Sequence, residues 1–356
     1  MPDDTHIQHP DTRIAVAMSG GVDSSVAAAL LAEAGRDVFG VTMVLGAART
    51  GDADDVELAR RACAALGIEH IAIDVSAAFE SLVIGPFCDA YAAGLTPNPC
   101  VWCNATLKLG VFAERVFALG ASHLATGHYA RLASDESGVW LERAADAAKD
   151  QSYFLHRVPP DMLARIEFPL GGLTKAEVRA MAAARSLPAA EHRESQEICF
   201  SNDHVALVTA RHPEAGVPGP IEDLSGTVLG THRGIARYTV GQRRGIGLAG
   251  PGGPYRVLRI DAERSAVIVG PEASLARHEV LLTDAIWRRD GPAHVSAQVR
   301  YRSAPVPAEA TPVVGGLHVA FAQPMPGLAP GQSVVLYRGS RAVGGGYVGP
   351  PPAVVS

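Results

Sequence analysis

Five cysteines are the residues of this 356-residue chain whose types and spacing suggest sulfur chemistry. Cys100 and Cys103 belong to a proline-stiffened stretch, residues 96–104, which we expect to precede a helix beginning near Ala105. A thiol at a helix N-terminus ionises more easily, and the thiolate is the nucleophile, so Cys103 is a candidate for attack on sulfur. Cys199 stands among polar residues and is predicted to be a second reactive thiol.

The same thiols allow other interpretations. A single Cys-x-x-Cys pair is weak evidence for zinc, which normally takes four ligands, and the chain has no second pair. Cys100, Cys103 and Cys199 could instead hold an iron–sulfur cluster with one open iron. For Cys63 and Cys88, which lie in apolar or helical surroundings, small buried side chains are the expected interpretation.

A phosphate-binding loop is predicted where the first strand ends and the first helix begins. Glycines let the backbone approach an anion closely, and the N–H groups at a helix start favour phosphate. The loop is neither a Walker A nor a Gly-x-Gly-x-x-Gly loop. The alternative to phosphate binding is a glycine-rich turn between strand and helix that binds no ligand. Asp23 could orient the loop or help to hold magnesium. The loop comprises Ala17, Met18, Ser19, Gly20, Gly21, Val22, Asp23 and Ser24.

The N-terminal half of the chain alternates apolar runs with Ala-rich helical stretches. Strands are predicted at residues 14–18, 38–44, 68–75 and 123–127. Helices between them end in Gly35, Gly67 and Gly120, as left-handed helix ends do. Thr174 and Glu177, three residues apart, predict a capping box at the start of a further helix. This pattern indicates an α/β fold with a doubly wound parallel sheet.

Beyond about residue 205 the pattern changes to short alternating runs between Gly- and Pro-rich turns, which indicates antiparallel β structure. We predict three domains, at residues 1–205, 206–275 and 276–356. The expected strands of the later part are residues 255–260, 266–269, 295–301 and 333–337.

Composition excludes several classes of protein. With 47% hydrophobic and 19% charged residues, the chain is expected to be globular, and no apolar run approaches the roughly 20 residues of a membrane span. An odd number of cysteines without a secretion signal argues against a disulfide framework and favours the cytoplasm. A net charge of −6 means that any nucleic-acid contact must be local.

The glycine-rich loop resembles the PP-loop of N-type ATP pyrophosphatases, which cleave ATP between its α and β phosphates. Together with five further strings, it makes nearly the whole chain resemble the tRNA-specific 2-thiouridylase family. That family has an adenine nucleotide α-hydrolase-like PP-loop domain, a small β-rich adaptor and a C-terminal β-barrel. The strings are residues 96–104, 125–131, 149–155, 195–200 and 238–247.

The resemblance implies an ATP-dependent sulfurtransferase that adenylates the C2 oxygen of the wobble uridine in tRNA and replaces it with sulfur. Cys199 would carry the persulfide and Cys103 would attack it, releasing sulfide or forming a transient disulfide. A sulfur donor protein would charge Cys199, and ATP with Mg²⁺ would be required. Two alternatives are a pyrophosphatase that amidates another substrate, which would need neither cysteine, and a non-catalytic RNA-binding or iron–sulfur sensor.

The resemblance also implies binding residues. ATP would be held by residues 17–24, Met43 and Gly127, and the target base would meet Asn98, Pro99 and Cys100. Some family members have Asp in place of Cys100, so a redox role for this thiol is not implied. Without the resemblance, residues 149–151 would be interpreted as a solvated surface turn. The implied tRNA contacts are His128, Lys149, Asp150, Gln151, Arg300, Tyr301 and Gln332.

Overall fold

The computed structural model describes residues 13–46, 51–188, 198–248 and 254–349. The chain divides into two compact units, each built from two segments. Unit 1 comprises Met1–Phe79 and Asn104–Phe200, and unit 2 comprises Glu80–Cys103 and Ser201–Ser356. The segment Glu80–Cys103 therefore groups with the C-terminal residues, although it lies within the predicted first domain. The division into three domains remains a prediction.

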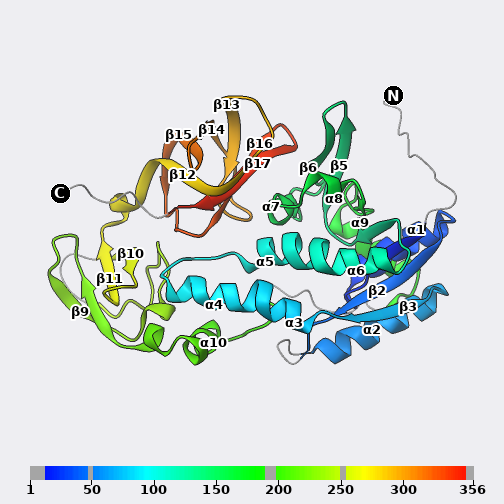
Figure 1. Ribbon diagram of the computed structural model, residues 1–356, viewed down its shortest axis with the longest axis horizontal. Coiled ribbons are helices and arrows are strands. Elements are labelled where there is room, and N and C mark those ends of the chain that lie inside the picture. The colour runs from blue at the N-terminus through cyan, green and yellow to red at the C-terminus, as the bar shows by residue number, and fades with distance from the viewer. Residues whose placement is uncertain (1–12, 47–50, 189–197, 249–253, 350–356) are drawn as a thin grey trace. The chain divides into compact units, whose positions relative to one another are not determined.

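Unit 1 contains a five-stranded sheet in which all strand pairs are parallel, with the order β3-β2-β1-β4-β7. Figure 1 shows β2 and β3 of this sheet, with α2 (Asp52–Leu66) alongside them. The sheet confirms the predicted α/β fold and its four strands. An antiparallel hairpin, β5–β6, follows β4 in the chain. The strands are β1 (Ile14–Ala17), β2 (Val38–Val44), β3 (His70–Asp74), β4 (His123–Thr126), β5 (Ala130–Asp135), β6 (Gly138–Arg143) and β7 (Ile166–Glu167).

Helices alternate with these strands, as the sequence predicts. Gly35, Gly67 and Gly120 have φ angles of 74°, 68° and 94°, so each helix end is left-handed and glycine is favoured there. The helical segments of unit 1 are α1 (Val22–Glu33), α2 (Asp52–Leu66), α3 (Ser76–Phe79), a π-helical stretch (Cys103–Phe112, which starts one residue before the unit), α6 (Ala113–Ala118), α7 (Ser152–Leu155), α8 (Pro160–Leu163) and α9 (Lys175–Ala184).

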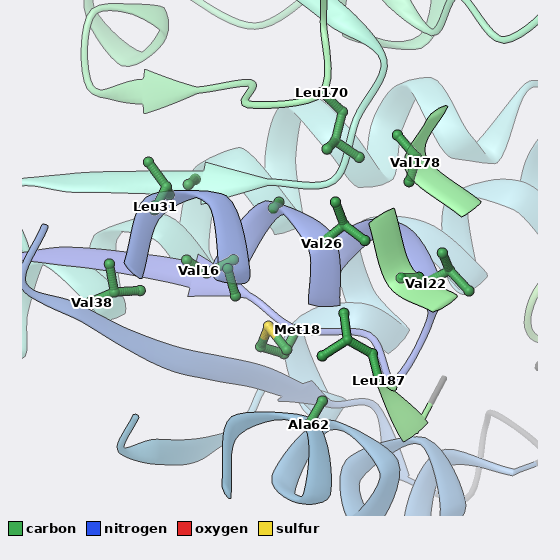
Figure 2. Packing of buried hydrophobic residues seen from close by; sticks show 14 of the residues in the cluster. Val16, Met18, Val22, Val26, Leu31, Val38, Ala62, Leu170, Val178 and Leu187 are labelled. Atoms are coloured by element: carbon green, nitrogen blue, oxygen red, sulfur yellow. The ribbon is translucent and has the colours of Figure 1, made fainter. Parts of the chain in front are cut away.

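The core of unit 1 joins β1, α1 and α9 in one apolar cluster. Val16 of β1, Val26 of α1 and Val178 of α9 are fully buried, and Figure 2 shows their side chains within this cluster. Burying a valine completely stabilises a fold by roughly 1.5–3 kcal/mol. The cluster therefore fixes α9 against α1, the helix that begins at the predicted phosphate loop.

Unit 2 contains β structure of two kinds. One is a four-stranded sheet with the order β10-β11-β8-β9, and the other is a six-stranded antiparallel barrel, β12-β15-β14-β13-β16-β17, which closes because β17 pairs with β12. The strands are β8 (Gly219–Glu222), β9 (Val228–His232), β10 (Arg256–Asp261), β11 (Ala266–Gly270), β12 (Ala276–Trp287), β13 (Ala293–Gln298), β14 (Val306–Val313), β15 (Gly316–Pro326), β16 (Ser333–Arg338) and β17 (Arg341–Val348).

Most of the later strands match their predicted positions. The strand expected at residues 295–301 instead ends at Gln298, because a turn follows in which the Arg300 amide donates to the Ser303 hydroxyl. The helical segments of unit 2 are a π-helical turn (Glu80–Ile84), α4 (Gly85–Ala92), α5 (Pro99–Trp102), α10 (His204–Arg211) and 3₁₀ turns at Pro213–Gly216, Ile235–Arg237 and Glu272–Leu275. Across the described ranges, no helix is both long and apolar enough to cross a membrane.

Candidate active site

The predicted phosphate loop connects β1 to α1 and is held in shape by its own serines. The Ser19 amide donates to the Ser24 hydroxyl at 3.2 Å, and that hydroxyl donates to the Gly21 carbonyl at 3.1 Å. Gly20 has a φ of 73°, and a Cβ there would lie 2.8 Å from the Asp55 carbonyl oxygen. The first N–H groups of a helix have no partner within that helix, so the start of α1 can accept an anion.

Gly127 closes the loop from the side of β4. A Cβ added at Gly127 would lie 2.7 Å from the Ser24 amide nitrogen and 2.8 Å from the Asp23 carbonyl carbon. Only glycine permits this approach, because contacts below about 3 Å would displace the backbone at the start of α1. The structure thus brings Gly127 together with the loop, as the resemblance implies.

Two residues that the sequence did not single out meet Asp23 of the loop. The Lys175 ammonium lies 2.7 Å and 2.8 Å from the two carboxylate oxygens, and the Tyr129 hydroxyl donates to one of them at 2.8 Å. Both residues stand beside signals that were recognised: Tyr129 follows Gly127 and His128, and Lys175 follows Thr174. The motif around Gly127 and the capping residue Thr174 predict these segments, but they do not identify Tyr129 and Lys175 as partners of Asp23.

A cavity of about 610 Å³ lies between the end of β2 and the start of α2. It is lined by Val44, Gly46, Gly51, Asp52, Ala53, Asp54 and Val56. Met43, the implied ATP contact on β2, is half-buried and directly precedes Val44. Because the Asp55 carbonyl of α2 also approaches Gly20, the cavity and the phosphate loop are parts of one region of unit 1.

His128 is buried and lies against the edge of the Phe168 ring. Its Nδ1 lies 2.8 Å from the Thr126 hydroxyl. Burial lowers the pKa of His128 well below its ordinary value, and the nearby positive charge of Lys108 acts in the same direction. The imidazole is therefore neutral at pH 7, and its surroundings are those of a packed side chain.

Residues 149–151 do not form the solvated turn that an interpretation without the resemblance would predict. Asp150 is buried, and its carboxylate accepts hydrogen bonds from the Arg143 guanidinium, the Ala144 amide and the Ser152 hydroxyl at 2.9–3.0 Å. Gln151 accepts a bond from the Tyr129 amide at 2.9 Å. Lys149 is half-buried. Asp150 and Gln151 therefore shape the chain beside Tyr129.

The helix at the Cys-x-x-Cys pair begins earlier than predicted. Asn98 is its N-cap and accepts a bond from the Cys100 amide at 3.2 Å, and Pro99 occupies the first helical position. Asparagine caps and first-turn prolines both favour this start. The expected start near Ala105 is thus wrong, and Cys100, not Cys103, lies in the first turn. Cys100 is exposed and Cys103 is partly exposed.

All five cysteines lie within the described residues, and no disulfide joins any of them there. Cys199 is exposed, and residues 195–197 of its motif lie outside the described residues. Cys63 and Cys88 are completely buried, which confirms their interpretation as core side chains, and burial raises the pKa of Cys63 to about 11. The iron–sulfur suggestion gains no support: among the described residues, no three His, Cys, Asp or Glu side chains gather as metal ligands would.

The three remaining implied tRNA contacts lie in unit 2. The Arg300 guanidinium donates to the Gly327 carbonyl, which ties the end of β13 to the end of β15. Tyr301 follows in the turn, and the Arg302 guanidinium lies 5.1 Å from the centre of its ring. The backbone amide of Gln332 donates to the Ala329 carbonyl, and Gln332 directly precedes β16. Arg300, Tyr301 and Gln332 therefore lie at the ends of barrel strands.

Three family profiles match consecutive parts of the chain. They describe a tRNA methyl transferase HUP domain (residues 12–203), a tRNA methyl transferase PRC-barrel domain (residues 207–271) and an aminomethyltransferase β-barrel domain (residues 277–348).

Curated relatives match over nearly their full length. The tRNA-specific 2-thiouridylase MnmA of Chloroflexus aggregans is 46% identical over 359 residues, which cover 95% of this chain and 98% of the relative. The protein of the same name from Paracoccus denitrificans is 42% identical, and the match covers 95% of this chain and 91% of that protein. Among solved structures, an NMN synthetase from Francisella tularensis matches with a TM-score of 0.34 and 19% identity. The match covers 51% of this chain and 66% of the synthetase chain.

Proposed function

Since this chain belongs to the tRNA-specific 2-thiouridylase family, we propose that it is a sulfurtransferase that uses ATP to place sulfur on C2 of the wobble uridine of tRNA. The observation that carries the proposal is the 46% identity with a 2-thiouridylase across 95% of this chain. The profile descriptions mention methyl transfer, but the relatives' names and the loop around Asp23 favour adenylation by ATP.

The first step is activation of the uridine. The start of α1 binds the phosphates, and the uridine C2 oxygen attacks the α phosphorus, which releases pyrophosphate and leaves an adenylated base. Magnesium, when bound with ATP, would offset the charge of the departing pyrophosphate. Asp23 fits this ion, because its carboxylate is 32% exposed beside the anion site.

The second step moves sulfur. The Cys103 thiolate attacks the inner sulfur of a Cys199 persulfide, so that a Cys103–Cys199 disulfide forms and sulfide is released. Sulfide then attacks C2 of the adenylated base and AMP leaves with the oxygen. An external thiol must reduce the disulfide before the next cycle. The exposure of Cys199 and the partial exposure of Cys103 support these roles.

We also propose that a persulfide-carrying protein charges Cys199, because an exposed thiol is accessible to another protein. The compartment proposed is the cytoplasm, where tRNA and reduced thiols occur together. The tRNA contacts proposed are those implied by the resemblance: His128, Lys149, Asp150, Gln151, Arg300, Tyr301 and Gln332, with Asn98, Pro99 and Cys100 at the target base.

The test uses purified protein, unmodified tRNA, ATP, magnesium and a protein persulfide donor, with 2-thiouridine measured by mass spectrometry. We expect thiolation by the wild type and a loss of more than 100-fold in both Cys199→Ala and Cys103→Ala. Cys88→Ala, which removes a buried thiol, should retain activity. Absence of thiolation by the wild type under every sulfur supply, with ATP still cleaved to AMP, would contradict the proposal and favour another pyrophosphatase reaction.

A further inference from the structure

Lys175 is a buried lysine whose ammonium reaches the phosphate loop from a helix 152 residues away in sequence. Its side chain is 9% exposed, whereas that of its partner Asp23 is 32% exposed. The Lys175 side chain is therefore shielded from water, whereas part of the Asp23 side chain remains accessible. Lysines are rarely buried without a paired charge, and the Asp23 carboxylate supplies that charge for Lys175.

The fold builds this position with several independent contacts. The capping box between Thr174 and Glu177 starts α9, which makes Lys175 the first residue of the helix. The Lys175 amide donates to the Asp146 carboxylate at 2.9 Å, and Val178, one turn later, packs in the core cluster of unit 1 (Figure 2). These contacts fix the backbone of Lys175 independently of the contact between its side chain and Asp23.

Asp23 is held from two directions. Lys175 lies within 2.8 Å of both carboxylate oxygens, and Tyr129 donates to one of them at 2.8 Å. The ammonium also lies 5.8 Å from the centre of the Tyr129 ring, so the three side chains form one group. A carboxylate with these donors has one orientation relative to the start of α1.

Without a bound metal ion, the negative charge of Asp23 opposes the binding of phosphate by the loop. A carboxylate in the first turn of α1 repels a triphosphate that the N–H groups and helix dipole attract. An ammonium in contact with that carboxylate makes the pair neutral, so the attraction of the helix start for phosphate remains. Because Lys175 is buried, water screens its charge less than it would screen the charge of an exposed lysine.

We propose that Lys175 is a positioning residue of the ATP site, which orients Asp23 and offsets its negative charge so that a triphosphate can bind the loop. The inference rests on the proposed use of ATP. Arg179, an exposed residue of the same helix, provides a matched control for loss of a positive charge.

The test measures ATP binding by isothermal titration calorimetry in excess EDTA, without tRNA or a sulfur source. We expect Lys175→Met to raise the Kd by tenfold or more, and Lys175→Arg and Arg179→Met to stay within threefold of the wild type. The single variant Asp23→Asn completes the double-mutant cycle and measures the effect of the carboxylate charge alone. The double variant Asp23→Asn/Lys175→Met, in which both charges are absent, should return to within threefold of the wild type.

Two results would overturn the inference. If Lys175→Met is folded by circular dichroism and binds ATP like the wild type, the pair only stabilises the fold. If the double variant binds as weakly as Lys175→Met, Lys175 contacts ATP directly and does not act through Asp23. Should Lys175→Met fail to fold, the double variant and Lys175→Arg, which keep the local charge balanced, supply the same comparison. Wild-type ATP binding without any thiolation would count against the proposed function alone.

Discussion

Of the glycines in the proposed ATP site, Gly127 has the least steric freedom, because the Ser24 amide nitrogen would lie 2.7 Å from an added Cβ. Gly127→Ala should displace the start of α1. Overpacking of this kind typically costs about 1–3 kcal/mol, which corresponds to a weakening of ATP binding of roughly 5- to 150-fold. Calorimetry checks this, with Gly172→Ala as the control, since a Cβ at Gly172 meets nothing within 4 Å. Equal Kd values for the two variants would contradict the steric argument.

His156 makes stability depend on pH. Its Nδ1 lies 2.8 Å from the Tyr153 carbonyl, and burial lowers its pKa from 6.5 to about 4. Between these values the unfolded chain binds the proton and the folded chain does not, so stability decreases as the pH falls, by at most about 3 kcal/mol at this site. His156→Gln should show a smaller decrease in melting temperature between pH 7 and pH 5 than the wild type. Parallel curves for the two proteins would show that His156 does not contribute.

The residues of the ATP site differ in how visible they are in the sequence. The loop from Ala17 to Ser24 was predicted because its signal is local: glycines and serines between a strand and a helix. Lys175 was not, because its partner Asp23 is 152 positions away and an isolated lysine in a first helical turn carries no sign of burial. The burial of Asp150 cannot be read from the local sequence either, since its donor Arg143 is on another element.

At the scale of elements, the capping box of α9 links stability to ATP binding. Thr174 accepts a bond from the Glu177 amide, and the Glu177 carboxylate accepts one from the Thr174 amide at 2.7 Å. Thr174→Ala should lower the free energy of unfolding by about 1 kcal/mol, as the loss of an N-cap usually does. It should also weaken ATP binding several-fold, because Lys175 is the next residue. Thermal unfolding and calorimetry measure the two effects, and Thr174→Ser should retain both properties.

Elements with strong local signals were predicted, and those decided by neighbouring structure were not. The four sheet strands and the capping box depend on apolar runs, glycines and a Thr–Glu spacing that can be read within a few residues. The helix at Cys100 was placed too late, although Asn98 and Pro99 are favourable starting residues, because two prolines nearby suggested a loop. The strand that ends at Gln298 was predicted too long, because its end is set by the turn to Ser303.

At the scale of the whole molecule, the compact units do not follow the order of the chain. The segment Glu80–Cys103 belongs to unit 2. There the Thr96 amide donates to the Pro330 carbonyl at 2.8 Å, and the ring centroids of Trp102 and Tyr347 lie 6.3 Å apart. No local pattern predicts contacts between positions more than 200 residues apart. These contacts therefore support the segment Thr96–Trp102, which contains Cys100 and directly precedes Cys103.

This arrangement predicts what happens when the barrel is removed. A chain truncated after residue 275 keeps the phosphate loop, Asp23 and Lys175 but loses Pro330 and Tyr347, the partners of the Thr96–Trp102 segment. We expect ATP binding to stay within threefold of the full chain, thiolation to fall at least 100-fold, and alkylation of Cys103 by iodoacetamide to become faster. Mass spectrometry of labelled peptides measures the last effect.

A point variant separates the support of Cys103 from the loss of the proposed RNA contacts, which truncation also removes. Gly331 has a φ of 85°, and a Cβ there would lie 3.1 Å from Leu95 Cβ and 3.3 Å from the Thr96 amide nitrogen. Gly331→Ala should therefore shift the segment while the barrel remains, with faster alkylation of Cys103 and unchanged ATP binding. Gly339→Ala, also at a left-handed glycine but with nothing within 4 Å, controls for backbone strain. If Cys103 reacts at the wild-type rate in both the truncated chain and Gly331→Ala, the barrel does not support the cysteine segment, and any loss of thiolation on truncation reflects RNA binding alone.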